Sequence, residues 1–578
     1  MGYKQIGYRL PQVNLISNTH LHYSNCFDRF FVNKLIAAFA VDIVLKHANP
    51  GDQAMLFPSH KTAQRCSDFI YTKDASSPKS RAQILDFCLD RSKVTTSTLL
   101  EINPTISAVI YPASKWPLAK QYWQHAGDGI SSRRAEFCHE LFTQGLLVEE
   151  RTLHESSTAR LHKGPKRYQK TSSIDLSHAN TKPQTPANVF PSVIEEVKES
   201  SQFVEERFGR NLNLSLVQNA QTAIKRRIAG CLTSEIDLHS QPSASPSQST
   251  RSGTLTEDDV YLYPCGMNAI FTTHQLLLST LTPLKSISFG FPYVDTLKIL
   301  EKWGPGCLFY GHGSESDIDD LQSRLERGER YLALFCEFPG NPLLKSPNLA
   351  RLHELSKKYG FVIVVDETIG NFININVLPY ADILVSSLTK IFTGECNVSG
   401  GSTILNPDSQ FYPRLKPALE ATYEMNYWVE DILFMERNSR DFISRIERIN
   451  TSTLAIISLL QSHPSVKRIY YPSLSPAREN YDACRTPHGG YGGLFSVTFH
   501  RHEQAVAFFD SIDTAKGPSL GTNFTLTSPY AILAHYGELE WAEGFGVERD
   551  LVRVSVGLEE EGVLRGIFGA ALEEVEKV

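Results

Sequence analysis

The chain has 578 residues, more than one ordinary hydrophobic core holds, which indicates roughly two to four domains. Charged residues make up 21% of the sequence and the net charge is −6, which gives no sign of a nucleic-acid partner. One basic cluster, Lys225-Arg226-Arg227, is interpreted as the solvated face of a helix. The longest apolar run, residues 35–45, is shorter than the about 20 residues that span a bilayer. No membrane partner is therefore expected.

The cysteines and the N-terminus bear on the compartment. The ten cysteines are scattered and form no C-x-x-C pair, so we expect no metal site and a reducing environment. Residues 1–10 lack the apolar stretch of a secretory signal. We therefore expect a cytoplasmic protein.

The first part of the chain is predicted to be an N-terminal extension domain, residues 1–195. It contains a helix-like stretch over residues 30–45 and a polar, linker-like stretch over residues 152–190. The charged segment 191–230 has apolar residues at helical spacing and predicts a helix. Residues 233–257 are of low complexity and are interpreted as a disordered surface insertion.

From residue 258 onward, short apolar strands alternate with amphipathic helices. The apolar runs are residues 331–338, 361–367 and 381–388, and a helix that ends at Gly360 separates the first two. Continuous apolar strands with helical crossovers predict a mostly parallel sheet covered on both faces. Ligands of such sheets bind at the carboxyl ends of the strands.

Polar side chains follow these three strands at regular intervals. Asn341, Asp366 and Lys390 are spaced by 25 and 24 residues, about the length of one strand, one helix and two turns. They should converge on one edge of the sheet. An amide, a carboxylate and an amine around one cleft suit a pyridoxal ring, since the carboxylate keeps the pyridine nitrogen protonated and the amine forms the imine.

A phosphate site is also predicted. Gly266 and Met267 begin an apolar helical stretch, where main-chain N–H groups and the positive end of the helix dipole attract anions. The hydroxyls of Ser387 and Thr389 are candidate additional donors. Together these residues would hold the phosphate of pyridoxal 5′-phosphate (PLP).

Two motifs resemble the Cys/Met-metabolism family of PLP-dependent enzymes, which includes cystathionine γ-synthase, cystathionine lyases and methionine γ-lyase. The first is the S-x-T-K pattern ending at Lys390, followed by the pair Gly400-Gly401. The second is RVSVGLE, residues 553–559. Residues 119–136, 207–212 and 516–526 are similar to fungal cystathionine γ-synthases in particular.

The resemblance implies a fold and an assembly. The fold is PLP fold type I, an α/β class similar to aspartate aminotransferase. A large PLP-binding domain would span residues 196–410 and a smaller C-terminal α/β domain residues 411–578. Members of the family act as homodimers or homotetramers with shared active sites, so the same is expected of this chain.

The resemblance also implies roles for the residues around the cofactor. Lys390 would form the Schiff base with PLP and move protons on the substrate. Asp366 would pair with the pyridine nitrogen and Asn341 with the ring oxygen. Tyr293 falls where the family stacks a tyrosine on the ring.

Further roles follow for the phosphate and the substrate. Arg210 would reach the phosphate of a neighbouring subunit, and Arg553, with Ser519 nearby, would bind the substrate carboxylate as a bidentate guanidinium. Two positions depart from the family. Phe208 stands where a tyrosine is usual, and Phe524 stands where bacterial γ-synthases carry a glutamate, so it is expected to make part of the pocket apolar.

The reaction predicted from the resemblance is γ-replacement on an O-acylhomoserine, with cysteine as the nucleophile and cystathionine as the product. One alternative is the same chemistry with another carbon or sulfur nucleophile, or a γ-lyase. A second is a catalytically silent regulatory subunit of the same fold. The presence of Lys390, Asp366 and Arg553 argues against the second alternative.

Overall fold

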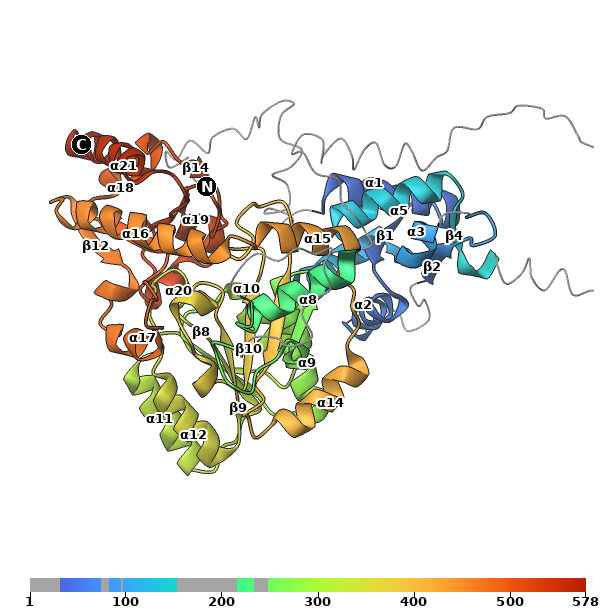
Figure 1. Cartoon of the computed structure of the whole chain (residues 1–578), viewed down its shortest axis with the longest axis horizontal. Helices are drawn as coiled ribbons and strands as arrows, with labels where there is room; N and C mark the ends of the chain where they lie inside the picture. The colour runs from blue at the N-terminus through green and yellow to red at the C-terminus, as the bar shows by residue number, and fades with distance from the viewer. Residues whose placement is uncertain (1–31, 74–82, 95–96, 153–215, 233–247) are drawn as a thin grey trace, which may run out of the picture. The chain divides into compact units, whose positions relative to one another are not determined.

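The computed structural model describes residues 32–73, 83–94, 97–152, 216–232 and 248–578, which form two compact units (Figure 1). Among the described residues, the N-terminal unit comprises 35–116 and 132–152. The catalytic unit comprises the rest, including residues 117–131. Within the described ranges, no helix is long and apolar enough to cross a membrane.

The N-terminal unit is built on a four-stranded antiparallel sheet with the order β1-β3-β2-β4. Its strands are β1 (Asp52–Phe57), β2 (Gln83–Leu89), β3 (Ile106–Pro112) and β4 (Leu147–Glu149). Its helices are α1 (Lys34–His47), α2 (His60–Lys73), α3 (Ser97–Ile102) and α5 (Ser132–Thr143). The helix predicted near residues 30–45 is α1.

An aromatic cluster forms part of the core of this unit. The Phe142 ring centroid lies 5.5 Å from those of Phe39 and Phe87, both at edge-on angles. Burial of such rings is a strong stabilising contribution. The buried guanidinium of Arg134 donates to the carbonyl oxygens of Pro58 and Thr105, at 2.9 and 2.8 Å, which ties α5 to two loops of the unit.

The catalytic unit contains a seven-stranded sheet with the order β5-β11-β10-β9-β8-β6-β7. The strands are β5 (Val260–Tyr263), β6 (Ser286–Phe289), β7 (Cys307–Tyr310), β8 (Ala333–Glu337), β9 (Val362–Asp366), β10 (Ile383–Ser387) and β11 (Gly401–Leu405). All neighbours from β10 to β7 are parallel, whereas β11 pairs antiparallel with both β10 and β5. The expected mostly parallel sheet is confirmed, and the three apolar runs are its neighbours β8, β9 and β10.

Helices flank this sheet (Figure 1). They are α8 (Val217–Ile228), α9 (Gly266–Thr280), α10 (Val294–Lys302), α11 (Glu315–Glu326), α12 (Leu349–Tyr359), α14 (Tyr412–Thr422) and α15 (Val429–Asn438). The helix predicted between the first two strands is α12. It ends at Gly360, whose φ of +77° is the left-handed conformation that glycine adopts without strain.

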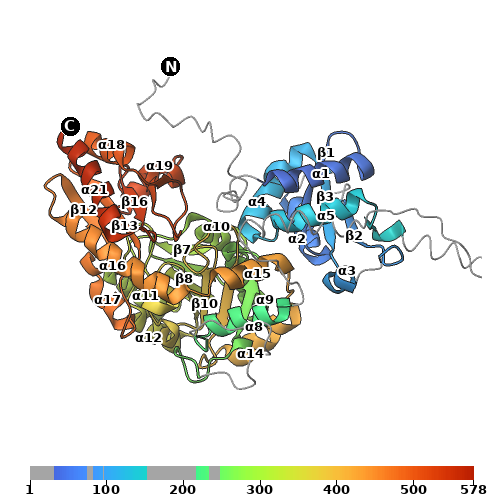
Figure 2. The same cartoon turned by 45° about the horizontal axis from the view of Figure 1, so that its top comes forward.

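The C-terminal part carries a second sheet of five strands with the order β12-β13-β16-β15-β14. Its strands are β12 (Val466–Tyr470), β13 (Leu494–Phe499), β14 (Ala515–Lys516), β15 (Leu526–Pro529) and β16 (Val552–Ser555). Helices α16 (Phe442–Gln461), α18 (His502–Ser511) and α21 (Glu561–Glu576) lie beside it (Figure 2) and share its buried apolar core. The short helices are α17 (Arg478–Cys484), α19 (Tyr530–His535) and α20 (Leu539–Gly544).

Residues 117–131 lie inside the predicted N-terminal domain, residues 1–195, but pack with the catalytic unit. The reason is a buried polar contact. Asn268 of α9 donates to the carbonyl oxygen of Ala126 at 2.9 Å and to the carboxylate of Asp128 at 2.6 Å. The hydroxyl of Tyr122 donates to the same carboxylate. The end of helix α4 (Trp116–Ala126) therefore contacts α9, one of the helices that flank the seven-stranded sheet.

Two other expectations need correction. The end of the predicted disordered insertion is ordered, since residues 248–257 are described and Arg251 is buried. The basic cluster is not wholly solvated, because the Arg227 guanidinium is buried and donates to Ser439 at 2.7 Å. Of the helix predicted over 191–230, residues 191–215 lie outside the described residues.

Candidate active site

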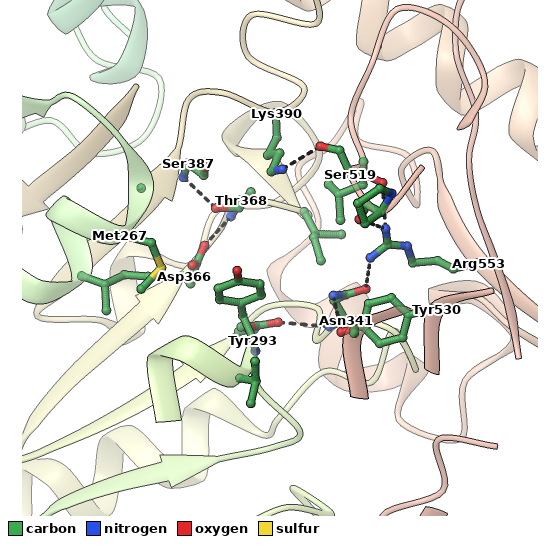
Figure 3. A pocket seen from close by; sticks show the side chains of 18 of the residues that line it. Met267, Tyr293, Asn341, Asp366, Thr368, Ser387, Lys390, Ser519, Tyr530 and Arg553 are labelled. Carbon is green, nitrogen blue, oxygen red and sulfur yellow. Dashed lines mark hydrogen bonds between the residues drawn. The ribbon is translucent and has the colours of Figure 1, made fainter. Parts of the chain in front are cut away.

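A pocket opens at the carboxyl ends of β8, β9 and β10, where the C-terminal part faces the large sheet (Figure 3). Its walls come from both parts of the catalytic unit. The lining residues are Gly266, Met267, Ile270, Tyr293, Val294, Glu337, Pro339, Asn341, Asp366, Thr368, Ile369, Ser387, Lys390, Pro518, Ser519, Leu520, Tyr530, Leu533, Ala534 and Arg553. The structure thus brings together nine of the eleven predicted site residues.

Lys390 projects into this pocket from the turn after β10. Its Nζ donates to Ser519 Oγ at 2.8 Å, a contact between the large sheet and the C-terminal part. Gly521 makes this approach possible, because a Cβ there would lie 3.1 Å from the Lys390 Cβ and 2.6 Å from the Ile391 amide nitrogen. The φ of Gly521 is also positive, +69°, so glycine is required here on two counts.

Asp366 ends β9 and is held by a short chain of hydrogen bonds. The main-chain N–H of Thr368 donates to Asp366 Oδ1 at 2.9 Å, and the N–H of Ser387 donates to Thr368 Oγ1 at 2.8 Å. The Thr368 side chain therefore links the ends of β9 and β10. A carboxylate fixed in this way suits a cationic ring nitrogen.

The start of α9 forms an anion cradle beside Ser387. Cys265, the residue before the helix, makes no side-chain cap, so the first N–H groups of this 15-residue helix are available to a ligand. A Cβ on Gly266 would lie 2.7 Å from the Ser387 Cβ, which explains the glycine. The Ser387 Oγ is buried and has no partner within the part of the chain that the structure describes. These features fit the phosphate of PLP.

Thr389, which was also predicted to hold the phosphate, makes a main-chain contact instead. Its hydroxyl exchanges hydrogen bonds with the main chain of Gly400, accepting from the N–H at 3.1 Å and donating to the carbonyl at 3.3 Å. Thr389 is not among the described residues that line the pocket. It shapes the turn that carries Lys390.

Glu337, at the end of β8, is a site residue that the sequence analysis missed. In the sequence it is only a polar residue near the end of an apolar run. Its carboxylate accepts the main-chain N–H groups of Tyr293 and Asn341, at 2.5 and 3.1 Å. Burial, and then the negative charge of Asp366, raise the pKa of Glu337 to about 8. Glu337 therefore fixes the two loops that present Tyr293 and Asn341 to the pocket.

Arg553, on β16, is the cation at the opposite wall. It is buried, with 2% of its surface exposed, and burial lowers its pKa to about 10, so it stays protonated at neutral pH. Its Nη1 donates to Asn341 Oδ1 at 3.1 Å. Its guanidinium carbon lies 4.6 Å from the ring centroid of Tyr530. A buried cation in an amino-acid-sized pocket is suited to a carboxylate.

Two residues singled out from the sequence, Arg210 and Phe208, lie outside the described residues. The expectation that Phe524 makes the pocket apolar is wrong for the described lining, because Phe524 is not part of it and its main chain packs against Gly557. The apolar surface comes instead from residues that the sequence analysis missed, among them Leu520 and Leu533.

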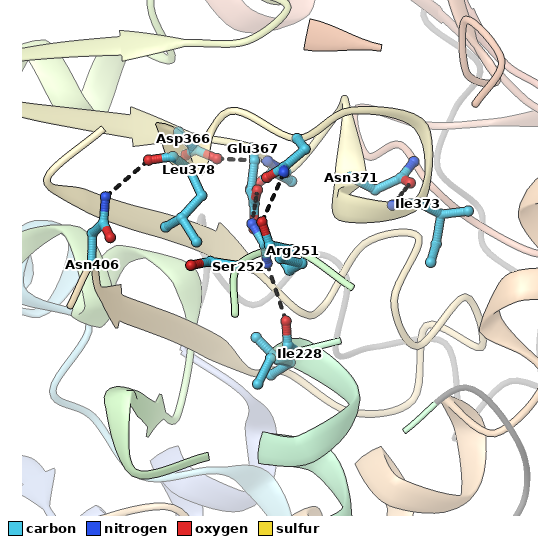
Figure 4. Close-up of polar contacts among 12 residues, drawn as sticks. Ile228, Arg251, Ser252, Asp366, Glu367, Asn371, Ile373, Leu378 and Asn406 are labelled. Atoms are coloured by element: carbon cyan, nitrogen blue, oxygen red, sulfur yellow. Dashed lines mark hydrogen bonds and ion pairs between the residues drawn. The ribbon is translucent and has the colours of Figure 1, made fainter. Parts of the chain in front are cut away.

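The residue that follows Asp366, Glu367, takes part in a buried ion pair (Figure 4). Arg251 Nη2 is 2.6 Å from Glu367 Oε2, and both side chains are 2% exposed. Arg251 also donates to the carbonyl oxygen of Ile228 at 3.1 Å. Burial raises the pKa of Glu367, whereas the charge of Arg251 opposes this rise. The pair attaches residues 248–257 to the residue that follows Asp366.

The sheet order and the lysine, carboxylate and anion cradle at its edge define a PLP-dependent enzyme of fold type I. Comparison with known proteins specifies the family. Residues 255–573 match the model of the Cys/Met metabolism PLP-dependent enzymes, and residues 35–131 match the N-terminal domain of fungal trans-sulfuration enzymes. The chain belongs to the Cys/Met-metabolism family of PLP-dependent enzymes.

Named relatives match nearly the whole chain. A cystathionine gamma-synthase of Neurospora crassa is 54% identical over 572 residues, covering 95% of this chain and 92% of that protein. A cystathionine gamma-synthase-like enzyme of Amanita muscaria is 37% identical, covering 95% of this chain and 91% of that one. The crystal structure of cystathionine gamma synthase from Xanthomonas oryzae pv. oryzae has the same fold, with 22% identity and a TM-score of 0.50, covering 63% of this chain and 98% of that one.

The buried ion pair leads to a prediction about stability. The substitution Arg251→Met should lower the free energy of unfolding by about 3–5 kcal/mol, because it leaves Glu367 buried without its cation. Removing both partners, in Arg251→Met with Glu367→Met, should cost less than the single change. Urea unfolding of the purified proteins measures both effects.

A matched control is Arg448→Met, since the pair Arg448–Glu560 is largely exposed. An exposed pair contributes about 0–1 kcal/mol. If Arg251→Met cost no more than Arg448→Met, the buried pair would not stabilise this region of the structure.

Proposed function

We propose that the enzyme catalyses γ-replacement on an O-acylhomoserine, with cysteine as the nucleophile and cystathionine as the product. The observation that carries the proposal is a single pocket that holds Lys390, Asp366 and Arg553, in a chain 54% identical to a protein named cystathionine gamma-synthase. PLP, when bound, supplies an electron sink that stabilises negative charge at the substrate carbon next to the amino group.

The residues of the chain divide the remaining tasks. Lys390 would carry the cofactor, and its Nζ would then take the proton from the substrate Cα and later one from Cβ. Its hydrogen bond to Ser519 holds the amine on the side of the pocket that the C-terminal part forms. The Asp366 carboxylate would face the pyridine nitrogen, where its negative charge keeps that nitrogen protonated.

Other residues of the pocket would bind and orient. Gly266, Met267 and Ser387 would hold the phosphate, and the Tyr293 ring would stack on the pyridine ring. Arg553 would bind the substrate α-carboxylate. Asn341 Nδ2 has two N–H bonds, and one donates to the Tyr530 hydroxyl. The other would donate to the ring oxygen of the cofactor. Thr389 would contribute by supporting the turn before Lys390.

A second candidate function is the same reaction with a different carbon or sulfur nucleophile. The lining of the pocket supports this candidate, because it offers few acidic groups to the ammonium group of cysteine. Among the described lining residues, the acidic side chains are Glu337 and Asp366, and Glu337 already accepts two main-chain N–H groups. An incoming ammonium group would then meet mainly apolar side chains such as Leu520 and Leu533.

A competition experiment separates the two candidates. The holoenzyme is supplied with O-acetylhomoserine together with cysteine, homocysteine, sulfide and acetoacetate in equal amounts, and each adduct is quantified by mass spectrometry. We expect cystathionine as the major product. If another adduct or 2-oxobutyrate dominated, the assignment of cysteine as the nucleophile would fail.

A second prediction concerns the lysine. Borohydride reduction of the holoenzyme should fix one pyridoxyl group on Lys390, located by peptide mass spectrometry, because Nζ of Lys390 lies in the pocket with Asp366. The variant Lys390→Ala should lose the label. The control Lys285→Ala, at an exposed lysine, should keep it. A label on any other lysine would overturn the role of Lys390.

We also infer that the enzyme is cytoplasmic and works as a homodimer or homotetramer with shared active sites. The described cysteines are thiols rather than disulfides, which supports a reducing compartment. The sequence resemblance at residues 207–212 supports a shared site, since it places Arg210 at the phosphate of a neighbouring subunit.

Subunit complementation tests the shared site. Arg210→Ala and Lys390→Ala proteins should each be nearly inactive, because each lacks one half of every site. Mixed under conditions that allow subunit exchange, they should regain part of the activity through hybrid oligomers that contain one intact site. Exchange without any recovery, with exchange shown by differently tagged subunits, would indicate that each chain forms its own site.

A further inference from the structure

Among the described residues, the guanidinium of Arg553 has two N–H groups without a partner, one on Nη1 and the one on Nε. The Nε group cannot complete a side-on bidentate grip, because that grip also needs Nη2. Both N–H bonds of Nη2 are used by main-chain carbonyl oxygens, that of Pro518 at 2.6 Å and that of Ser519 at 2.7 Å. One N–H of Nη1 donates to Asn341. An arginine usually grips a carboxylate with two parallel N–H bonds. In this arrangement Nη1 and Nη2 cannot both serve a substrate unless a main-chain carbonyl loses its partner.

Asn341 shows where a second donor lies. An arginine only donates, so the Asn341 amide must turn its oxygen toward Arg553 and its NH2 group toward the Tyr530 hydroxyl, 3.1 Å away. The Tyr530 oxygen is therefore an acceptor in this contact. Its own proton remains available to a further acceptor in the pocket that Tyr530 lines.

The surroundings of Tyr530 keep this proton in place. The side chain is buried at 5% exposure, and burial raises the pKa of its hydroxyl above the usual range. The Arg553 guanidinium lies against its ring. The hydroxyl and Arg553 Nη1 are both hydrogen-bonded to the same amide group, and a carboxylate separates its two oxygens by about as much as an amide separates its oxygen and nitrogen. One carboxylate can therefore reach both groups from the pocket side.

We propose that Tyr530 donates the second hydrogen bond to the α-carboxylate of the amino-acid substrate, beside the remaining N–H of Arg553 Nη1. The inference rests on the proposed function, in which the substrate is an amino acid. Tyr530 is thus a substrate-binding residue, and Asn341 is the positioning residue that sets the direction of its hydroxyl. Ser519 is the less suited donor, because its hydroxyl contacts Lys390 and not the Asn341 amide that Arg553 and Tyr530 share.

The test compares two ligands that differ only in the carboxylate. L-2-aminobutyrate and propylamine share the same carbon chain and amino group, but propylamine has no carboxylate. Both are titrated into the holoenzyme and followed by the absorption spectrum of the cofactor, which gives dissociation constants without turnover. In the Tyr530→Phe variant, 2-aminobutyrate should bind about 10- to 100-fold more weakly, as expected for a lost hydrogen bond to a charged group. Propylamine should bind as in the wild type.

The matched control is Tyr471→Phe. Tyr471 is also buried and its hydroxyl donates to the carbonyl oxygen of Gly492 at 2.9 Å, in the C-terminal core. This variant should bind both ligands as the wild type does. The phenylalanine at position 530 keeps the ring against Arg553, and cofactor content together with thermal unfolding verifies the fold.

The outcomes are distinguishable. A wild-type enzyme with no preference for 2-aminobutyrate over propylamine would overturn the amino-acid substrate and, with it, this inference. A wild-type preference that Tyr530→Phe leaves unchanged would overturn the role of Tyr530 alone. Equal weakening of both ligands by Tyr530→Phe would show that the tyrosine shapes the pocket rather than binding the carboxylate.

Discussion

The parallel alignment of β8, β9 and β10 is the constraint on which the active site depends. Hydrogen bonding pairs Glu337 with Asp366 and Val385 with Asp366 across this part of the sheet. β8 and β9 therefore end at one level, β10 continues to Ser387, and the residues that follow the three strands lie at the same edge of the sheet. Asp366 lies on a strand and has little freedom, whereas Asn341 and Lys390 occupy the turns that follow. The relative positions of these three residues are therefore set by main-chain pairing. Side-chain substitutions elsewhere hardly disturb this pairing.

Much of this arrangement was predictable from the sequence. Three apolar runs and a repeat of about 25 residues were enough to place Asn341, Asp366 and Lys390 together, since the crossover length fixes which residues follow each strand. The glycine at position 266 marked the phosphate cradle for a related reason. A helix start that must approach Ser387 closely leaves no room for a Cβ, and this constraint is visible in the sequence as a glycine.

Other features were beyond the reach of a sequence pattern. Tyr530 lies 189 residues from Asn341 along the chain, and no local periodicity marks a tyrosine that will meet a distant amide. Phe524 illustrates the converse error, because a position in a motif does not determine which side of the main chain faces the ligand. Arg251 was misjudged for a third reason. The composition indicated a polar, serine-rich stretch, but its end is held by the buried ion pair with Glu367 and by further hydrogen bonds.

The two walls of the pocket have a consequence for how such an enzyme diversifies. One wall, on the large sheet, contains the groups suited to the cofactor. The other wall is formed largely by residues 518–534 and 553, and under the proposed function it would face the incoming molecules. Lys390 and Asn341 contact both. Substitutions in the second wall can therefore change which nucleophile reacts, while the cofactor-binding groups of the first wall stay the same. Related enzymes could in this way form new products with unchanged cofactor chemistry.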